Sequence, residues 1–379
     1  MIGVNFFGDL YGEGSLSEVA RTTLDTIARR GIAFTSNELL YPYDMYREGI
    51  RPDPRYEGLP RGSVYAANLF CYNMHLFGTI TPERLADLTQ GKHTIASWVW
   101  EMPDVPEVWQ PQFERVDEIW APSRFVQASF EKVTANPVIV VPHPIDVRPS
   151  ADARRTAFGL PDDRAIFLFS FSAGSGDGRK NPWGAIEAYR RAFGDSRAAD
   201  KPLLLIKVQH SAHYPDITAG LAAELETIGG RLISEPYTRQ RVHDLYFCVD
   251  AFVSLHRAEG FGLGMAEAMC AGVPVIATAY SGNLDFMTPD NGYLVDYQLR
   301  AVTVDDHRYR PDLIDYYRPG MIWAEPDVDQ AAEYMQAVYE HPEEARERGR
   351  RAAETIARDF SPDAVGAIME ARIRAAVTA

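Results

Sequence analysis

Short apolar runs alternate with amphipathic stretches of helical periodicity along the chain. In the first half, residues 15–30 are predicted to be a helix, and the predicted strands are residues 2–7, 64–70, 93–99, 118–121 and 138–141. Strands separated by helices favour parallel sheets with helices on their faces. We therefore expect the first half to be a doubly wound α/β domain.

The same alternation begins again after the polar run RPSADARR at residues 148–155. Here residues 183–193 are predicted to be a helix, and the predicted strands are residues 165–171, 203–208, 231–234, 251–255 and 273–277. Sheets of this kind bind ligands at the carboxyl ends of their strands, so two such halves predict a site in the cleft between them. We expect an ordered insertion after Tyr297 and a helical region over 329–376.

Composition narrows the class of protein. The 379 residues are 46% hydrophobic and 24% charged, a balance typical of a folded enzyme, and the net charge of −15 disfavours nucleic acid or an anionic membrane as partner. The three cysteines lie far apart, which argues against a disulfide framework or a zinc site. The first residues lack the features of a signal peptide and the chain has no apolar run of membrane-spanning length, so we expect no transmembrane anchor and a cytoplasmic location.

The stretch EGFGLGMAE, residues 259–267, carries the strongest chemical signal. It connects a predicted strand to a predicted helix through a loop rich in glycine. Glycines allow close approach of a ligand, and a helix N-terminus offers amide donors and partial positive charge, which together suit a diphosphate. The flanking carboxylates of Glu259 and Glu267 would repel phosphate, so we expect them to face hydroxyl groups of a sugar and of ribose. The alternative interpretation is that this stretch is only the start of a helix and that Glu267 faces solvent.

This stretch and its continuation EAMCAGVPVIATAYSGNLDFM resemble the retaining GT-B glycosyltransferases of the family 4 type (glycosyl transferases group 1). The resemblance implies an α/β fold of two Rossmann-like domains facing each other across a cleft. It implies that Glu267 binds ribose and that Glu259 lies by the donor sugar. It also implies that the amides around Phe261, Gly262 and Leu263 meet the phosphate and the sugar.

The resemblance also suggests domain roles. Residues 1–148 would form the acceptor-side domain and residues 149–355 the domain that binds a nucleotide-sugar donor. The final helix, within residues 356–379, would pack back on the first domain.

A second loop, GSGDGRKNP, places Arg179 and Lys180 after a predicted strand and before a helix. Its spacing fits neither a P-loop nor a dinucleotide fingerprint. A basic pair at this edge suits a diphosphate leaving group, whose negative charge it would stabilise. By resemblance to the family we assign that role first to Lys180 and second to Arg179. Surface charges at an exposed helical turn are the simpler alternative.

Three further positions belong to the predicted donor side. In similar enzymes, the loop that contains Glu235 and Tyr237 presents backbone groups to the nucleobase. Gly14 lies in a Gly-rich loop before the first helix, with Ser15 or Ser17 as the expected cap. In GT-B enzymes this loop lies near the donor phosphate, although a tight strand–helix turn explains the glycines equally well.

The acceptor side is predicted less directly. His75 follows a strand, at a position where related enzymes carry a histidine that touches the sugar, and Asn73 lies beside it. A purely structural role for His75 explains this position equally well. Trp100 and Glu101 would stack on a sugar ring and bind its hydroxyls, unless the tryptophan is an ordinary core residue.

The sequence therefore predicts transfer of a sugar from a nucleoside diphosphate donor to an acceptor hydroxyl. The resemblance implies retention of configuration. The motif Asp327-Val-Asp329 resembles a metal-binding DxD, but its place after Pro326 predicts a helix cap, and we expect no metal and no cofactor besides the donor. The acceptor is left open among a saccharide, a lipid-linked sugar and a small molecule, as are the donor base and the oligomeric state. A nucleotide-sugar 2-epimerase and a non-catalytic nucleotide-sugar-binding protein are the competing functions.

Overall fold

The computed structural model describes residues 2–12, 14–39, 53–194 and 201–378. The chain divides into two compact units. Unit 1 comprises Met1–Ile145 and Arg358–Ala379, and unit 2 comprises Asp146–Ala357. Each unit has its own sheet and its own hydrophobic core.

Unit 1 is built on a six-stranded parallel sheet of order β2-β1-β3-β4-β5-β6. Its strands are β1 (Gly3–Gly8), β2 (Ala33–Asn37), β3 (Ala67–Cys71), β4 (His93–Ser97), β5 (Glu118–Ala121) and β6 (Val138–Val140). β1, β3 and β5 are buried along their whole length, because a parallel sheet is covered on both faces. The strand order reverses between β1 and β3, so a ligand site is expected at the carboxyl ends of these two strands.

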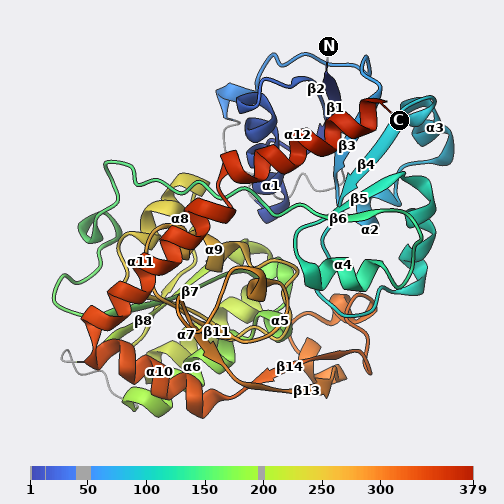
Figure 1. Cartoon of the computed structure of the whole chain (residues 1–379). Coiled ribbons are helices and arrows are strands. Elements are labelled where there is room, and N and C mark those ends of the chain that lie inside the picture. Colours follow the sequence, from blue (N-terminus) through green and yellow to red (C-terminus); the bar gives the residue numbers. More distant parts are fainter. Residues whose placement is uncertain (1, 13, 40–52, 195–200, 379) are drawn as a thin grey trace. The chain divides into compact units, whose positions relative to one another are not determined.

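The helices of unit 1 are α1 (Ser15–Arg29), α2 (Met74–Phe77), α3 (Pro82–Thr89), α4 (Arg124–Phe130) and α12 (Pro362–Thr378). α12 lies beside α1 and contacts β1 and β3 (Figure 1). Its buried positions Val365, Met369 and Ile373 recur every four residues and so form one apolar stripe. Arg372 of α12 also pairs with the buried carboxylate of Glu118 on β5.

Unit 2 contains a six-stranded parallel sheet of order β12-β11-β10-β7-β8-β9. Its strands are β7 (Ile166–Ser172), β8 (Leu203–Gln209), β9 (Arg231–Ile233), β10 (Ala251–Ser254), β11 (Val275–Thr278) and β12 (Tyr293–Val295). This is the strand order of the Rossmann fold, with its switch point between β7 and β10. The loops that follow β7 and β10 therefore meet at the place where such a sheet binds its ligand.

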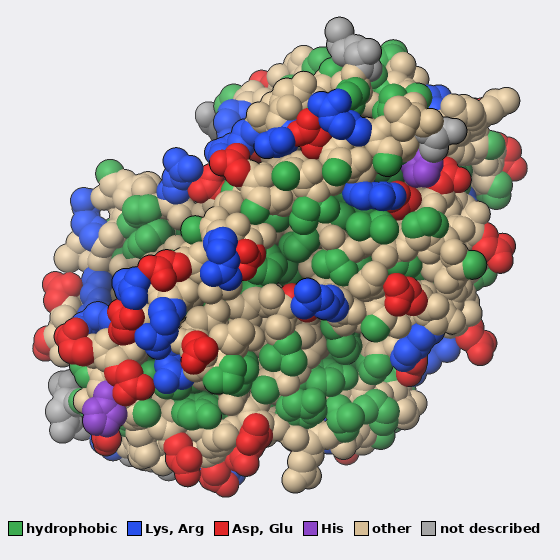
Figure 2. Space-filling model, in the orientation of Figure 1, with side chains coloured by type: hydrophobic (Ala, Val, Ile, Leu, Met, Phe, Trp, Pro, Cys, Tyr) green, Lys and Arg blue, Asp and Glu red, His purple; other side chains and the backbone are tan. Residues whose placement is uncertain are grey.

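The helices of unit 2 are α5 (Asp177–Lys180), α6 (Pro182–Phe193), α7 (Pro215–Thr227), α8 (Arg239–Tyr246), α9 (Leu263–Cys270), α10 (Val328–Glu340) and α11 (Pro342–Asp359), the last of which runs across the unit boundary. Acidic and basic side chains alternate on the exposed face of α11 and form i,i+3 and i,i+4 ion pairs (Figure 2). Between β12 and α10, an antiparallel hairpin is formed by β13 (Tyr297–Ala301) and β14 (Ile322–Pro326).

The structure confirms most predicted elements and corrects others. Asp327 caps α10 by accepting from the backbone N–H groups of Asp329 (3.0 Å) and Gln330 (3.1 Å), as its sequence context predicts. The predicted cap of α1 was wrong: Gly14 holds the N-cap position, because the Ser17 hydroxyl donates instead to Asp9 at 2.6 Å. β2 was missed because AFTSN is short and largely polar. In the described part of the chain, no helix has both the length and the apolar character needed to span a bilayer.

Candidate active site

The loop between β10 and α9 brings backbone amides to the carboxyl edge of the unit 2 sheet. Gly262 is the N-cap of α9 and has a left-handed φ of 96°, and a Cβ at this position would lie 2.3 Å from Met265 Cε. The amides of Met265 and Ala266 donate to the Gly262 carbonyl, at 3.0 and 3.1 Å. The amides of Leu263 and Gly264 are donors that the helix itself does not use. The phenyl ring of Phe261 turns inward and packs against Phe286, with ring centroids 5.2 Å apart. The geometry is that of an anion site at a helix N-terminus.

Glu259 lies between two cations from the loop after β7. Its side chain is 9% exposed, and its Oε1 contacts Lys180 Nζ and lies 3.4 Å from Arg179 Nη1. Burial alone would raise the pKa of Glu259, but the charges of Lys180, Arg179 and His256 outweigh it and lower the pKa to about 2. Glu259 is therefore an ionised hydrogen-bond acceptor at neutral pH and not a proton donor.

The connection after β7 that carries both cations (residues 173–181, the cation loop) is bound to the loop after β10 (residues 255–262, the β10 loop) by hydrogen bonds to backbone carbonyls. Asn181 follows α5 with a left-handed φ of 56°, and its Nδ2 donates to the Leu255 carbonyl at 2.9 Å. Arg179 is itself buried, donating from Nη1 to the Ala258 carbonyl at 2.9 Å, and its own carbonyl accepts from the Arg257 N–H at 2.8 Å. The two loops thus meet at the switch point as one connected structure.

Glu267 lies one to two turns into α9 and is contacted by α8. Its Oε2 accepts from the Tyr246 hydroxyl at 3.1 Å, and its Oε1 contacts Arg239 and lies 3.6 Å from His243 Nε2. Glu267 is 3% exposed, so it does not face bulk solvent as the alternative interpretation required. Arg239 and Tyr246 were missed by the sequence analysis, because their proximity to Glu267 depends on how α8 packs against α9.

The predicted nucleobase loop is held by two side chains of β8. Lys207 Nζ donates to the Glu235 carbonyl at 3.0 Å, and burial lowers the pKa of Lys207 to about 8. Gln209 Nε2 donates to the Tyr237 carbonyl at 3.0 Å and its Oε1 accepts from the Tyr237 N–H at 3.4 Å. The backbone groups of Tyr237 are therefore already bonded within the protein, which weakens the predicted role of this residue in base recognition.

In unit 1, the first Gly-rich loop is organised by Asp9. Its Oδ1 accepts from the backbone N–H groups of Tyr11 (3.0 Å) and Gly12 (3.2 Å). A Cβ at Gly12 would lie 2.4 Å from Asp9 Oδ2, whereas a Cβ at Gly14 would meet nothing within 4 Å. Gly12 therefore packs more closely than Gly14 against side chains of this loop, and the role of Gly14 near the donor phosphate stays a prediction.

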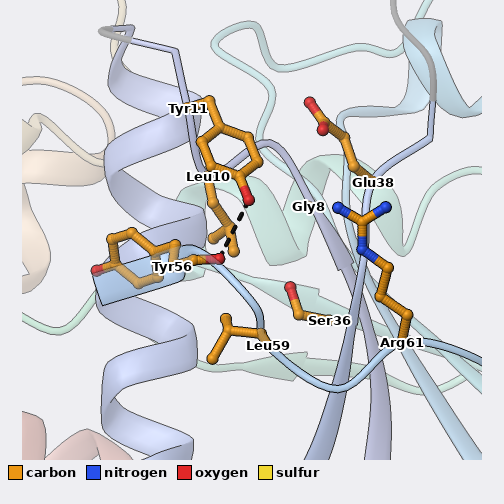
Figure 3. Close-up of a pocket in the computed structure, with 8 residues that line it drawn as sticks. All are labelled: Gly8, Leu10, Tyr11, Ser36, Glu38, Tyr56, Leu59 and Arg61. Atoms are coloured by element: carbon orange, nitrogen blue, oxygen red, sulfur yellow. Dashed lines mark hydrogen bonds between the residues drawn. The ribbon is translucent and has the colours of Figure 1, made fainter. Parts of the chain in front are cut away.

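A pocket opens at the carboxyl ends of β1 and β2 in unit 1. It is lined by Gly8, Leu10, Tyr11, Ser36, Glu38, Tyr56, Leu59 and Arg61. Figure 3 shows the side chains of Glu38 and Arg61 on one side of this pocket, and Tyr11 and Tyr56 on the other. The Tyr11 hydroxyl donates to the Tyr56 carbonyl at 3.1 Å. Ser36, Glu38 and Arg61 were not predicted, and the first two lie in or directly after β2, which was itself missed.

The predicted acceptor-side residues lie near one another after β3 and β4. Asn73 caps α2, and its Oδ1 also accepts from the Val99 N–H at 3.2 Å. His75 and Trp100 both pack against Trp109, with ring centroids 6.1 and 4.9 Å away, and burial lowers the pKa of His75 to about 4. Trp100 is 2% exposed and has no open face for a sugar, which favours the core interpretation. Glu101 follows it and is partly buried.

Residues 221–301 match the family model described as glycosyl transferases group 1. The match includes the α8, β10 and α9 segments that hold Glu259 and Glu267. This region of the chain is therefore similar to the glycosyl transferases group 1 family.

Two curated relatives are similar to part of this chain. Both are named D-inositol 3-phosphate glycosyltransferase. The protein of Mycolicibacterium smegmatis is 30% identical over 138 residues, and that of Xylanimonas cellulosilytica is 31% identical over 148 residues. The matched stretches cover 35% and 38% of this chain, but 29% and 33% of the relatives' own lengths.

Solved structures resemble the whole chain. The Anabaena HepE protein in complex with UDP and glucose has a TM-score of 0.67 at 12% identity, covering 99% of this chain and 100% of its own. Sucrose-phosphate synthase of Thermosynechococcus elongatus has a TM-score of 0.70 at 17% identity, covering 99% and 98%. These likenesses confirm the predicted α/β fold of the GT-B type.

Proposed function

We propose that this protein is a glycosyltransferase that moves a sugar from a nucleoside diphosphate donor to an acceptor hydroxyl, with retention of configuration. The observation that carries the proposal is the cluster of Glu259, Lys180 and Arg179 beside the N-terminus of α9. The cations and the backbone amides suit a diphosphate, and the ionised carboxylate of Glu259 suits hydrogen bonds from sugar hydroxyls. Its place at the switch point is where this sheet type binds ligands.

In the proposed reaction, the acceptor hydroxyl attacks the anomeric carbon as the bond from that carbon to the phosphate oxygen breaks. The leaving phosphate gains negative charge, which Lys180, Arg179 and the amides of Leu263 and Gly264 stabilise. As the new glycosidic bond forms, the acceptor hydroxyl loses its proton, and the departing phosphate takes that proton up. Glu259 stays ionised and holds a sugar hydroxyl, while Glu267 accepts from the ribose. Because fixed cations already face the diphosphate, we propose that no metal takes part.

We place the acceptor at the carboxyl ends of the unit 1 strands. Around the small hollow there, Glu38, Arg61 and Ser36 carry a carboxylate, a guanidinium and a hydroxyl, groups that form hydrogen bonds with polyhydroxyl compounds. The names of the two curated relatives make inositol phosphate the first acceptor to try, and the UDP in the HepE complex makes UDP-sugars the first donors.

The experiment is a turnover assay with UDP- and GDP-sugars against polyol, sugar-phosphate and saccharide acceptors, with products resolved by mass spectrometry and NMR. We expect nucleoside diphosphate release that depends on the acceptor, with one new glycosidic bond per nucleotide released. A 2-epimerase would release nucleotide and an epimerised free sugar with no acceptor present. A non-catalytic protein would bind donor and release nothing.

A further inference from the structure

The segment of residues 296–327, between β12 and α10, lies against the cation loop. It contains the β13–β14 hairpin and the two short helical turns Val304–His307 and Pro311–Asp315. The match to the glycosyl transferases group 1 model ends at residue 301, so most of this segment lies outside it. Its contacts with residues 173–180 are therefore a feature of this chain that the family match does not describe.

The two faces of the β13–β14 hairpin differ in character. Tyr297, Leu299 and Ile322 point outward and are exposed, and Figure 2 shows hydrophobic side chains over this hairpin. On the inner face, Trp323 is fully buried, and the guanidinium carbons of Arg257 and Arg300 lie 5.6 and 5.3 Å from its ring centroid. Because successive side chains of a strand point to opposite faces, these residues lie on opposite faces of the hairpin.

Arg257 joins the hairpin to the cation loop. Its Nε and Nη2 donate to the two carboxylate oxygens of Glu325, at 2.8 and 2.9 Å, and its Nη1 donates to the Gly178 carbonyl at 2.5 Å. Its backbone N–H donates to the Arg179 carbonyl at 2.8 Å, and its carbonyl accepts from the Ala324 N–H at 2.9 Å. Arg300 Nε also donates to Glu325, at 2.6 Å, so this carboxylate orients two arginines.

Other parts of the segment contact the cation loop independently of Arg257. The Tyr317 ring centroid lies 5.6 Å from the Arg179 guanidinium carbon. Arg310 Nη1 donates to the Ala173 carbonyl at 2.8 Å. A Cβ at Gly178 would lie 2.0 Å from the Asp306 carbonyl oxygen, so the two backbones approach closely enough to require glycine. Asp306 is held in turn by both terminal nitrogens of Arg300.

We infer that residues 296–327 act as a brace that holds Arg179 and Lys180 in position for the β-phosphate of the donor, with Glu325 and Tyr317 as positioning residues. The inference rests on the proposed function, because it assigns a ligand to these two cations. Neither Glu325 nor Tyr317 is a catalytic residue. Glu325 acts through Arg257, which binds the backbone of the cation loop, and Tyr317 acts through the guanidinium of Arg179. Loosening the brace should therefore weaken diphosphate binding and leave the ribose contact at Glu267 intact.

The test is a calorimetric titration of the full chain with UDP and UMP, repeated with GDP and GMP. Variants are Glu325→Gln, Tyr317→Leu and Tyr317→Phe, with Glu347→Gln as the matched control, since Glu347 is an exposed partner of Arg350 on α11. We expect the UDP Kd to rise about 5- to 20-fold in Glu325→Gln and Tyr317→Leu, with the UMP Kd within about 2-fold of wild type. Tyr317→Phe keeps the aromatic ring beside the Arg179 guanidinium, so its UDP Kd should stay close to that of wild type.

The outcomes separate the two proposals. Wild type that binds no nucleotide, or binds UDP no better than UMP and GDP no better than GMP, overturns the proposed diphosphate site itself. Wild type that prefers the diphosphate, together with folded brace variants that keep the same preference, overturns the brace alone. Equal losses of UDP and UMP affinity in the brace variants also overturn it, because they indicate general loss of structure.

Discussion

At the scale of single residues, the site depends on a carboxylate that two neighbouring cations keep ionised. Glu259 has a pKa lowered from 4.5 to about 2 in the folded protein. A lowered folded pKa contributes stability that is present above the unfolded pKa and is lost as the pH falls towards the folded one. The ionised form of Glu259 thus stabilises the fold by about 3 kcal/mol at pH 5, since one pKa unit corresponds to about 1.4 kcal/mol.

Glu259→Gln removes this titration. We expect the difference in unfolding free energy between wild type and Glu259→Gln to shrink by about 3 kcal/mol from pH 5 to pH 2, as measured by urea denaturation. Other carboxylates titrate in both proteins, so they cancel in the difference. A difference that is constant over this pH range would contradict the ion-pair geometry.

Glu267 is a second residue whose predicted role can be isolated. We expect Glu267→Ala to weaken UDP binding by ~1.5–3 kcal/mol, the scale of a hydrogen bond to a charged group. The affinity for 2′,3′-dideoxy-UDP, which lacks both ribose hydroxyls, should stay within about 3-fold, because the contact is already absent. Calorimetry measures both, with Glu333→Ala on the exposed face of α10 as control. Equal losses for both nucleotides would remove the ribose assignment.

Sequence reasoning located residues whose position follows from chain order. Glu259 and Lys180 each follow a predicted strand, and strands in a parallel sheet end at the same edge. The partners of Glu267 could not be predicted from chain order, because Arg239 and Tyr246 approach it only through the packing of α8 on α9. The bonds from Gln209 to Tyr237 likewise depend on side-chain geometry that no local pattern encodes.

At the scale of elements, the start of α9 depends on a backbone conformation that favours glycine. Gly262 and Gly272 stand at the two ends of this helix with φ values of 96° and 77°. A Cβ at Gly262 would collide with Met265, whereas a Cβ at Gly272 would meet nothing within 4 Å. The two sites therefore share the strain of a positive φ and differ in packing.

Gly262→Ala should lower the unfolding free energy by about 2–4 kcal/mol, from the left-handed backbone plus the collision, and should weaken UDP binding. Gly272→Ala should cost only about 1–2 kcal/mol, from the backbone alone, and leave UDP binding unchanged. Thermal denaturation and calorimetry provide the two readouts. Equal nucleotide affinities in the two variants would show that the α9 N-terminus does not contact the nucleotide.

The long parallel strands and amphipathic helices were predictable because their periodicity spans several residues. β2 was not, since AFTSN is largely polar, and the three-residue β12, YLV, was also missed. The hairpin of residues 297–326 was predicted only as an ordered insertion. Its inner face includes Arg300, Trp323 and Glu325, whose positions depend on contacts with Arg257 and with one another and not on hydrophobic alternation.

At the scale of the whole molecule, each unit has a hydrophobic core of its own, and helix α12 belongs to that of unit 1. Ile373 of α12 is fully buried in the unit 1 core. Ile373→Ala should destabilise unit 1 by about 2–5 kcal/mol through the cavity it leaves. UDP affinity should stay within about 2-fold, because the proposed nucleotide contacts lie in unit 2. Denaturation with and without UDP measures both the unfolding free energy and the UDP affinity. A large loss of UDP affinity would contradict the assignment of the donor site to unit 2 alone.

The central claim is that the β7 and β10 loops of unit 2 bind a nucleoside diphosphate through Lys180. The most direct measurement is a calorimetric titration of wild type and Lys180→Met with UDP and GDP. We predict that wild type binds at least one of them and that Lys180→Met weakens that binding by about 10-fold or more, the effect of losing a charge-assisted hydrogen bond. Binding of equal strength in both proteins, or none in wild type, would contradict the account.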